Sequence, residues 1–388
     1  MTTETAAPPA LTMLTEEEQL FKEAIGDFAQ GEIAPKAREM EQNGRYDEAL
    51  LRSLFEMGVM GVEVPEAYGG TGASFFQCIL AVEEISKADA AVGALVDVQN
   101  TLFNVGLIRY ANEEQKKKYL SRVATDTVAA YALSEAGSGS DAFALACRAE
   151  QRGDEWVLNG HKLWITSGDE AGVYLVFANA DPSQGYKGIT AFIVERDDPG
   201  FSVGKRESKL GIRASSTTEL LLDNCTIPND RVLGEVGKGY KYAIEILNEG
   251  RIGIGSQMIG ISTGALEAAT AYSKERVQFG KPICKFQAVQ HQLAECATRL
   301  EAAKLLVYNA SRLRDAGKPF IKEAAMAKLY SSNAAEFITS AAVEILGGYG
   351  YTTEYPVEKM YRDAKIGKIY EGTSFMQLNT IAKVLLSE

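Results

Sequence analysis

The chain has 388 residues, of which 46% are hydrophobic, and its formal net charge at pH 7 is -12. This length exceeds what a single hydrophobic core usually serves, so two or three packed units are expected. The acidic balance argues against a nucleic-acid partner, because neutralising phosphates requires clustered Lys and Arg.

The number and spacing of the cysteines and histidines limit which metal sites and disulfide bonds the chain can form. The cysteines form no CxxC pair, and their scatter suits reduced thiols in a reducing compartment; they are Cys78, Cys147, Cys225, Cys284 and Cys296. The histidines His161 and His291 are too few and too far apart for a His-rich metal site, and there is no GxSxG elbow. We therefore expect no metal centre.

The sequence predicts no membrane-spanning or targeting segment. No apolar run reaches the ~18 residues that a membrane span requires. The first 14 residues contain no arginine and no apolar core, so as written they are neither a signal peptide nor a transit peptide.

The first third of the chain is predicted to be helical. Residues 1–13 are expected to form a disordered tail, after which Thr15 and Glu18 fit a capping box at the start of a helix that Pro35 ends or kinks. Further helical runs are expected at residues 50–60, 75–87, 90–110 and 113–123. We place this helical domain at residues 14–126.

The composition then changes to short β-rich runs separated by Gly, Asn, Asp and Pro. Their spacing is close to that of a sandwich or a barrel. They lie at residues 131–133, 156–158, 163–166, 174–178, 189–194, 201–203 and 220–222. We place this β domain at residues 127–236.

Helical periodicity returns for the last part of the chain, residues 237–388. One long helix is predicted at residues 240–277 although five glycines lie inside it. Each interior glycine costs ~1 kcal/mol relative to alanine, so their number suggests close approach by another helix or a ligand. Further helices are expected at residues 286–314, 319–346, 357–369 and 375–386, which completes a bundle.

Glu371 is a single carboxylate on a glycine-flanked turn at a helix end, next to Tyr370 and Gly372. The pattern alone allows two interpretations. A loop carboxylate is usually solvated, because loops are surface segments, whereas a turn at this point can also direct the carboxylate into a cleft.

The surrounding segment, YPVEKMYRDAKIGKIYEGTS at residues 355–374, resembles the C-terminal signature of the acyl-CoA dehydrogenases. In that family the glutamate of the YEG turn is the catalytic base, a role that the resemblance assigns to Glu371. It also implies a fold made of an N-terminal helical domain, a middle β-barrel and a C-terminal four-helix bundle.

A second candidate is the run LSEAGSGSD at residues 133–141. Gly137, Gly139 and Ala142 match a dinucleotide fingerprint as a pattern, but that site needs a helix directly after the glycines, and residues 147–158 favour a strand. The run is either a plain turn or a loop that admits a flavin and an acyl thioester. It resembles the segment of the acyl-CoA dehydrogenases that lies against the flavin and the acyl thioester.

Trp164 lies in the run NGHKLWITSG, residues 159–168. A lone tryptophan is more often a core residue, but this run resembles the family's second flavin segment, in which the tryptophan packs on the isoalloxazine. His161 is then a surface variant without a catalytic part.

Residues 248–251, Asn-Glu-Gly-Arg, form either a salt-bridge or capping cluster or part of an acyl-CoA site. The resemblance implies the site. Some relatives carry the base immediately before this arginine; here that position is Gly250, so Glu371 has no competitor.

Arg276 by itself is a helix-end cation. In the family, the arginine that corresponds to Arg276 and the glutamine that corresponds to Gln287 reach the FAD of a neighbouring subunit. A cation suits the negative charge of the FAD phosphates.

The resemblance covers residues 15–386 and is closest to members that act on short or 2-methyl-branched acyl-CoA. It implies cofactor contacts from Tyr131, Ala132, Leu133, Ser134, Gly139, Ser140, Trp164, Ile165, Thr166, Arg276, Phe279, Gln287, Glu344, Leu346, Gly347, Gly348, Thr373 and Phe375. It implies substrate contacts from Ser140, Tyr186, Tyr240, Asn248, Glu249, Gly250, Arg251 and Gly372. Phe375 departs from the small or polar residue that relatives often have there.

The implied function is FAD-dependent α,β-dehydrogenation of a short or 2-methyl-branched acyl-CoA by a homotetramer that passes electrons to an electron-transfer flavoprotein. The setting is fatty acid β-oxidation or branched-chain amino acid catabolism, in the mitochondrial matrix of a eukaryote or the cytoplasm of a bacterium. Three alternatives share the same residues: an acyl-CoA oxidase, an enoyl-CoA reductase working in reverse, and a non-catalytic scaffold.

Overall fold

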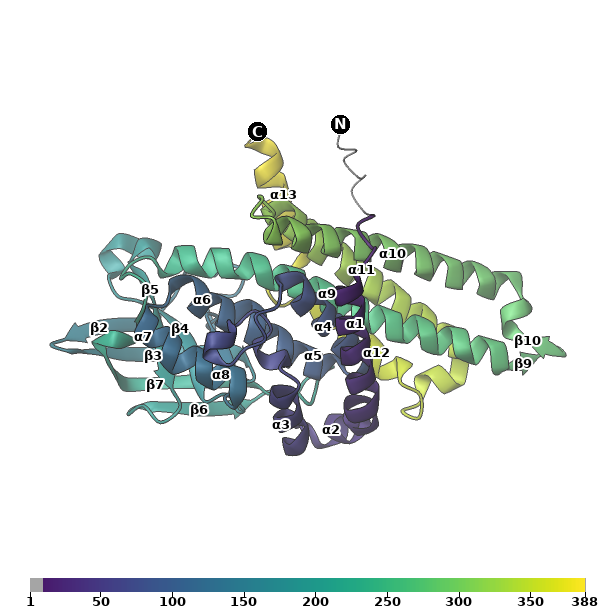
Figure 1. The fold of residues 1–388 in the computed structure, drawn as a ribbon, viewed down its shortest axis with the longest axis horizontal. Helices are drawn as coiled ribbons and strands as arrows, with labels where there is room; N and C mark the ends of the chain where they lie inside the picture. Colours follow the sequence, from purple (N-terminus) through teal and green to yellow (C-terminus); the bar gives the residue numbers. More distant parts are fainter. Residues whose placement is uncertain (1–9, 388) are drawn as a thin grey trace, which may run out of the picture.

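The computed structural model describes residues 10–387, in the order helices, sheet, helices (Figure 1). Residues 1–9 of the expected tail lie outside the described residues. Within the described part, Met13 is held at the bundle, because Arg312 Nη2 donates to its carbonyl oxygen at 3.2 Å.

The N-terminal region is helical, as predicted. Thr15 and Glu18 form the expected capping box, with each side chain accepting from the other residue's backbone N–H at 3.2 and 2.9 Å. Pro35 lies in a short 3-10 turn that links the first helix to the second. The helices are α1 (Glu16–Phe28), α2 (Ala37–Asn43), α3 (Glu48–Glu56), α4 (Phe75–Ala88), α5 (Ala90–Asp97), α6 (Val105–Tyr110), α7 (Glu113–Gln115) and α8 (Ser121–Thr125).

Helices α5 and α6 are joined by a π-helical segment, Val98–Asn104. The combined run Ala90–Tyr110 is long and apolar enough to cross a membrane by composition, which the sequence reading did not anticipate. Its most apolar window is 94% buried inside the fold, so it packs as a core helix.

The middle region forms one mixed sheet at the position predicted for the barrel. Its strands are β1 (Ala129–Ala132), β2 (Arg148–Arg152), β3 (Glu155–Thr166), β4 (Val173–Asn179), β5 (Ile189–Glu195), β6 (Phe201–Arg206), β7 (Thr217–Pro228) and β8 (Val232–Leu233). The order is β6-β7-β3-β2-β4-β5-β8, and β1 pairs with β4 in parallel, with Tyr131 opposite Leu175.

Strand β3 is continuous where the sequence predicted two separate runs. Its pairing with β7 shifts register twice, between Leu158 and Gly160 and between Lys162 and Ile165. The first shift has its extra residue on β7 and the second has its extra residue on β3. Such a β-bulge bends a strand without ending it. Gly160, at the first shift, leaves room for Cys147, because a Cβ there would lie 2.7 Å from Cys147 Cα.

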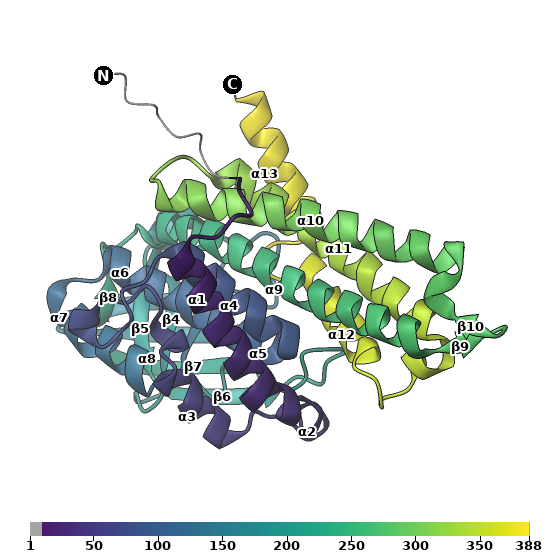
Figure 2. The same cartoon turned by 45° about the vertical axis from the view of Figure 1, so that its right-hand side comes forward.

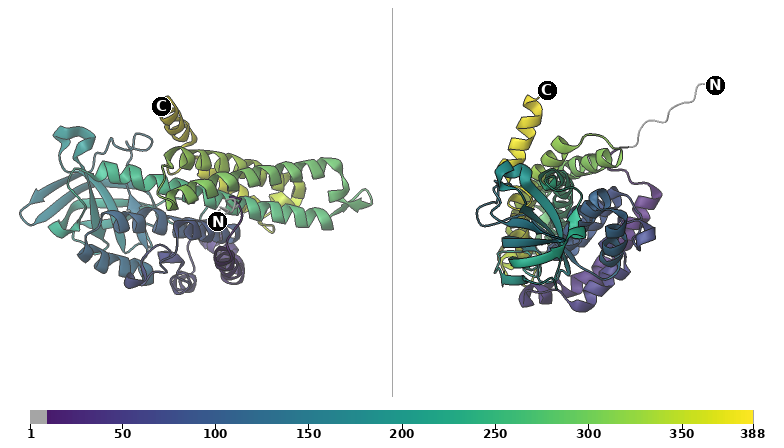
Figure 3. Two further views of the ribbon diagram at one scale, coloured as in Figure 1. Left: turned by 45° about the horizontal axis from the view of Figure 1, so that its top comes forward. Right: turned by 90° about the vertical axis from the view of Figure 1, so that its left-hand side faces the viewer.

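The C-terminal region is built on three long helices, α9 (Gly239–Glu275), α10 (Gln287–Asp315) and α11 (Ile321–Leu346). They run side by side from the sheet to a small hairpin at the far end, with α12 (Val357–Ala364) alongside and α13 (Ser374–Leu386) projecting from the bundle (Figures 1 and 2; Figure 3, left). The expected helices are confirmed, most of them to within two residues.

The end of α9 differs from the prediction, which extended the helix to Val277. The chain instead leaves the helix at Arg276 and forms the hairpin of β9 (Val277–Gln278) and β10 (Lys281–Pro282). Phe279 and Gly280 make the turn, with φ values of 49° and 77°. Two positive φ angles are what a tight two-residue hairpin turn requires.

The glycines inside α9 do allow close helix packing. A Cβ at Gly255 would lie 2.8 Å from Val307 Cγ2 of α10, and a Cβ at Gly260 would lie 2.3 Å from the Glu83 carbonyl oxygen of α4. Helix α9 is therefore the central element against which the N-terminal helices and the rest of the bundle pack.

Candidate active site

The turn that carries Glu371 lies between α12 and α13 and is fixed from two sides. The Gly372 carbonyl oxygen accepts hydrogen bonds from Lys328 Nζ at 2.6 Å and from Gln377 Nε2 at 2.8 Å. Glu371 and Gly372 have φ values of 49° and 89°. A non-glycine residue with positive φ is strained, and such strain persists only where the surroundings enforce it, often at functional sites.

Two further contacts fix the approach to this turn. The Tyr370 hydroxyl donates to Gln257 Oε1 of α9, and Ser332 Oγ of α11 donates to the Gly367 carbonyl oxygen at 2.9 Å. The turn is therefore held between the two central helices of the bundle.

The Glu371 side chain points from this turn onto α9. A Cβ at Gly250 would lie 2.2 Å from Glu371 Oε2 and 2.7 Å from Leu102 Cδ2. No real Cβ contact is that short, so the carboxylate occupies space that only a glycine leaves open.

The Glu371 carboxylate is poorly solvated. Its Oε2 atom is buried and has no hydrogen-bond partner within residues 10–387. Burial raises the pKa of Glu371 to about 7, while the charges of Lys328 and Arg251 act to lower it. Burial dominates the balance, so the group titrates close to neutral pH.

Both neighbouring cations are themselves partly desolvated. Burial lowers the pKa of Lys328 to about 8, although the charge of Glu371 opposes that shift. Burial also lowers the pKa of Arg251, whose Nη1 donates to Asn248 Oδ1 at 2.7 Å. Asn248 thus orients the arginine that faces the carboxylate.

The two predicted flavin segments lie against each other in the sheet. The Leu163 N–H donates to the Ser134 carbonyl oxygen at 2.9 Å, and Lys162 Nζ donates to the Leu133 carbonyl oxygen at 3.0 Å. Lys162 also pairs with Glu135 at 2.6 Å, and both side chains are buried. This ion pair is the structural core of the junction, and the sequence reading did not identify it.

Trp164 is directed outward at the second register shift, where β3 carries the extra residue. It has φ = 64° and its side chain is 61% exposed, while its neighbour Ile165 is buried. β-Bulges next to sites often redirect one side chain in this way. Thr166 continues the strand opposite Thr217 of β7.

Tyr131 of β1 lies near enough to the Glu371 turn for the charge of Glu371 to act on its hydroxyl. Its hydroxyl is buried without a hydrogen-bond partner within the described chain. Burial, assisted by the charge of Glu371, raises the pKa of Tyr131 well above its ordinary value. Beyond it, Ala132 and Leu133 are buried, and Gly139 and Ser140 are exposed.

The remaining predicted cofactor residues of the C-terminal turn are accessible. Thr373 is half-buried and lies at the start of α13, and Phe375 is 77% exposed. An aromatic ring with that exposure, beside the Glu371 turn, is available to contact a ligand or another subunit.

A second group of predicted cofactor residues lies at the opposite end of α9. Arg276, Leu346, Gly347 and Gly348 line a pocket of about 500 Å³. The Arg276 guanidinium lies 5.5 Å from the Tyr349 ring centre.

The outer members of this second group surround that pocket on exposed surface. Phe279 is 94% exposed at the hairpin turn, and Gln287 is exposed at the start of α10. Glu344 is exposed and accepts from Gln292 Nε2 at 3.2 Å.

The two groups are too far apart to meet within one chain. From Gly250, beside Glu371, to Glu275 the helix α9 is unbroken. A rise of 1.5 Å per residue over these 25 residues gives roughly 37 Å. The structure therefore does not bring Arg276 together with Glu371.

The predicted substrate residues Tyr186 and Tyr240 do meet, near the start of α9. Their rings pack edge to face with centres 5.1 Å apart, and Phe143 joins both at 6.5 Å. Phe143 was not predicted; its position in the loop after the glycine-rich run was the available signal.

Glu249 is the predicted substrate residue whose side chain is engaged elsewhere. It is fully buried, and its carboxylate pairs with Arg109 and, at 3.0 Å, with Arg314. Glu249 thus links α9 to α6 and α10, whereas its neighbours Gly250 and Arg251 face Glu371.

Lys328 and Asp97 are two residues near Glu371 that the sequence reading missed. Lys328 lies on the apolar face of α11, between Ala324 and Ser331. Asp97 is the acidic last residue of the otherwise apolar helix α5. A charge at an apolar helical position was the available signal in both cases.

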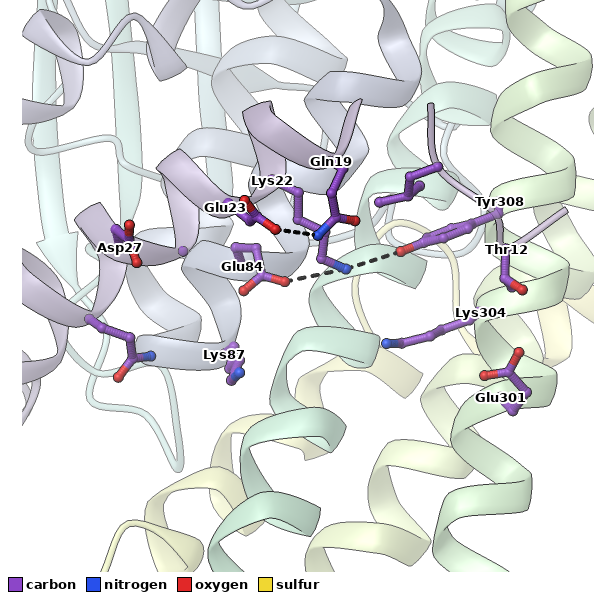
Figure 4. Close-up of a pocket in the computed structure, with 13 residues that line it drawn as sticks. Thr12, Gln19, Lys22, Glu23, Asp27, Glu84, Lys87, Glu301, Lys304 and Tyr308 are labelled. Carbon is purple, nitrogen blue, oxygen red and sulfur yellow. Dashed lines mark hydrogen bonds and ion pairs between the residues drawn. The ribbon is translucent and has the colours of Figure 1, made fainter. Parts of the chain in front are cut away.

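A roomy pocket of about 810 Å³ lies away from these residues, between α1, α4 and α10 (Figure 4). Some of its polar side chains contact one another: Lys22 Nζ pairs with Glu84 at 3.3 Å and donates to the Tyr308 hydroxyl at 3.4 Å. We interpret it as a structural contact that holds α1 on the bundle. Within residues 10–387 no group of three or more His, Cys, Asp or Glu could hold a metal ion.

Comparison with known families matches the chain to three acyl-CoA dehydrogenase models. The N-terminal domain model covers residues 15–127, the middle domain model residues 130–225 and the C-terminal domain model residues 237–386.

A short/branched chain specific acyl-CoA dehydrogenase, mitochondrial, from Rattus norvegicus is 52% identical over 97% of this chain and 88% of its own length.

Solved structures show the same similarity. A chain in the study of the electron transferring flavoprotein of Acidaminococcus fermentans has a TM-score of 0.96 and 44% identity, over 97% of this chain and all of that one. Butyryl-CoA dehydrogenase from Megasphaera elsdenii has a TM-score of 0.94 and 42% identity, over 96% and 99%. An acyl-CoA dehydrogenase from Bacillus anthracis complexed with FAD has a TM-score of 0.91 and 32% identity, over 98% and 69%.

Replacing Lys328 should raise the pKa of Glu371. Lys328→Met removes a cation that favours the ionised carboxylate. A nearby charge of opposite sign lowers a carboxyl pKa by about 1–3 units. The measurement is a pH titration of the infrared carboxyl band that Glu371→Gln removes. Wild type should titrate at about 7, and the variant at higher pH.

Lys322→Met is the matched control, because Lys322 also lies on α11 but pairs with Glu323 at 3.6 Å near the surface. An unchanged midpoint in Lys328→Met would contradict the charge balance described here.

Proposed function

The chain belongs to the acyl-CoA dehydrogenase family, and from that premise we propose that Glu371 is the base that removes the α-proton of a short or 2-methyl-branched acyl-CoA. One observation carries this proposal: the buried Glu371 carboxylate, on a strained turn against Gly250, with its pKa raised to about 7. A general base is most effective when its pKa lies near the working pH.

The chemistry requires a carboxylate placed in this way. The α-C–H group of a thioester is a weak acid, so its proton leaves only to a base within hydrogen-bond reach while the charge on the carbonyl oxygen is stabilised. An acyl chain that enters beside Glu371 excludes water and desolvates the carboxylate further, which makes it a stronger base.

The Glu371 backbone N–H is the donor we propose for the thioester oxygen. It donates to no acceptor within residues 10–387. The positive φ angles of Glu371 and Gly372 hold this peptide in place. A fixed donor stabilises developing negative charge without reorganising during the reaction.

The residues present fit a flavin cofactor. The exposed rings of Trp164 and Phe375 provide stacking surfaces, and the open space around Gly137 and Gly139 provides room for a ligand. The buried hydroxyl of Tyr131, which has no hydrogen-bond partner within residues 10–387, provides a donor. The FAD complex of the Bacillus anthracis relative supports this identification. When bound, FAD would accept the β-hydrogen as hydride, while the protein orients the acyl group.

The substrate class rests on similarity to the short/branched chain relatives, at 52% identity. The aromatic cluster of Phe143, Tyr186 and Tyr240 gives a surface for the adenine of CoA. One methylene group is worth ~1–3 kcal/mol of discrimination, so the preference should be graded. Equal kcat/KM for 2-methylbutanoyl-CoA and palmitoyl-CoA would count against a short, branched substrate.

The distant pocket at Arg276 is proposed to receive the FAD of a neighbouring subunit. Roughly 37 Å of helix separates it from Glu371 within one chain. Exposed apolar side chains at Phe279 and Leu386 suit further subunit contacts. We propose a homotetramer, a dimer of dimers, because closed symmetric assemblies are the common outcome for homo-oligomers.

Electrons are proposed to pass to an electron-transfer flavoprotein, an acceptor suggested by the Acidaminococcus fermentans study in which the similar chain was solved. An oxidase would instead consume oxygen. Substrate-dependent oxygen uptake that matches the rate of product formation would therefore contradict this proposal.

The Glu371→Gln variant tests the base directly. It keeps the shape of the side chain and removes its basicity, and general-base catalysis is typically worth about 10²–10⁴-fold. In single-turnover stopped flow the variant should bind FAD and acyl-CoA and reduce the flavin roughly a hundredfold more slowly, or worse. A flavin-reduction rate within threefold of the wild-type rate would mean that another residue removes the α-proton.

Mixing two inactive variants tests the shared cofactor site. Arg276→Ala keeps Glu371 but impairs the neighbour's FAD, and Glu371→Gln keeps Arg276. Co-assembled subunits should regain about a quarter of wild-type activity, because random pairing across a two-fold interface completes that share of the sites. If one chain bound its FAD alone, no mixed assembly would recover activity.

A further inference from the structure

Asp97 is a second buried carboxyl group in this region. It is the last residue of α5, where the helix passes into the π-helical segment Val98–Asn104. Such π segments often mark functional sites. Asp97 is fully buried; its Oδ1 accepts from Thr101 Oγ1 at 2.9 Å, and its Oδ2 has no hydrogen-bond partner within the described chain.

Asp97 and Glu371 lie against the same face of α9. A Cβ at Gly253 would lie 1.8 Å from Asp97 Oδ1, as a Cβ at Gly250 would lie 2.2 Å from Glu371 Oε2. Residues three apart on a helix are neighbours on one face, with Cβ positions about 5–6 Å apart. Asp97 Oδ1, which accepts from Thr101, and Glu371 Oε2, which has no partner within the described chain, therefore meet this face about one helical turn apart.

The charges around the two carboxyl groups are unequal. Lys328 of α11 and Arg251 of α9 act on Glu371. The ionisable group that acts on Asp97 is Glu371 itself; burial first and that charge second raise the pKa of Asp97 well above its ordinary value. The other titratable groups facing the pair are Cys78, Tyr131 and Tyr370.

Two interacting carboxyl groups in one site do not ionise together, so the protons leave in two separate steps. Because both cations act on Glu371, the first step ionises Glu371 and leaves Asp97 protonated. A protonated carboxyl group is a hydrogen-bond donor.

We propose that Asp97 is a positioning residue for the base, a protonated carboxyl group whose Oδ2–H donates toward the Glu371 carboxylate, directly or through one water molecule. The inference rests on the proposed role of Glu371. A donor to the charged form of a carboxylate lowers its pKa. Asp97 thus offsets part of the effect of burial and keeps Glu371 ionised at neutral pH.

Two variants separate this role from packing. Asp97→Leu has nearly the same shape and no donor. In a plot of the flavin-reduction rate against pH, the acid limb, where the rate falls as Glu371 becomes protonated, should move up by about one pH unit. That is the effect of losing one hydrogen bond to a carboxylate. Below that limb the rate should fall about tenfold and recover at higher pH. Asp97→Asn retains an N–H donor and is neutral, so its acid limb should stay where the wild type has it.

A second readout does not depend on turnover. The infrared spectrum of the wild-type holoenzyme without substrate should contain a protonated carboxyl band that persists above the titration of Glu371 and is missing in Asp97→Asn. This measurement decides the question even if Asp97→Leu fails to fold. It also remains valid if Glu371→Gln reduces the flavin normally, so failure of the proposed base and failure of the Asp97 role are distinguishable.

Three results would overturn the inference. The first is an acid limb in a folded Asp97→Leu that coincides with wild type, which would leave Asp97 a packing residue. The second is an acid limb in Asp97→Asn that moves down by about one unit, which would mean that Asp97 is ionised in the wild type. The third is the absence of a protonated carboxyl band above the titration of Glu371.

Discussion

The structure around Glu371 depends on one constraint, the placement of a desolvated carboxylate on the central helix α9. The carboxylate fits only because Gly250 has no side chain, and the turn holds it there at a positive φ angle while Lys328 anchors the following carbonyl oxygen. Burial makes the group basic, and the nearby cations keep it ionisable. Packing and proton affinity are thus two consequences of the same contact.

Helix α9 also explains how the site relates to the whole molecule. Its glycines let α4 and α10 approach closely, which buries the helix and brings the N-terminal helices next to the Glu371 turn. Its length places Arg276 at the opposite end of the bundle, far from Glu371. The cofactor site proposed to be shared between subunits follows from this separation, because two-fold assembly can bring opposite ends of two such helices together.

Many of the helices could be predicted from the sequence, because local sequence patterns determine where they form. The capping box at Thr15 and the helical periodicity of the C-terminal region depend on neighbouring residues alone. The outward direction of Trp164 depends on a bulge in the pairing of β3 with β7, and the roles of Lys328 and Asp97 depend on contacts between distant helices. Glu249 shows the opposite limit: it adjoins Gly250 in sequence, but its carboxylate pairs with Arg109 and Arg314 of two other helices.

The measurement that tests the account most directly is single-turnover flavin reduction by Gly250→Ala, compared with Gly31→Ala. The added methyl group cannot coexist with Glu371 Oε2 at 2.2 Å, whereas a Cβ at Gly31 has nothing within 4 Å. We predict that Gly250→Ala reduces the flavin at least roughly tenfold more slowly, because displacing a reacting group by about 1 Å can cost 10²-fold in rate. The FAD content and the melting temperature of Gly250→Ala should equal those of the control. A rate within threefold of the control would contradict the placement of the base against α9.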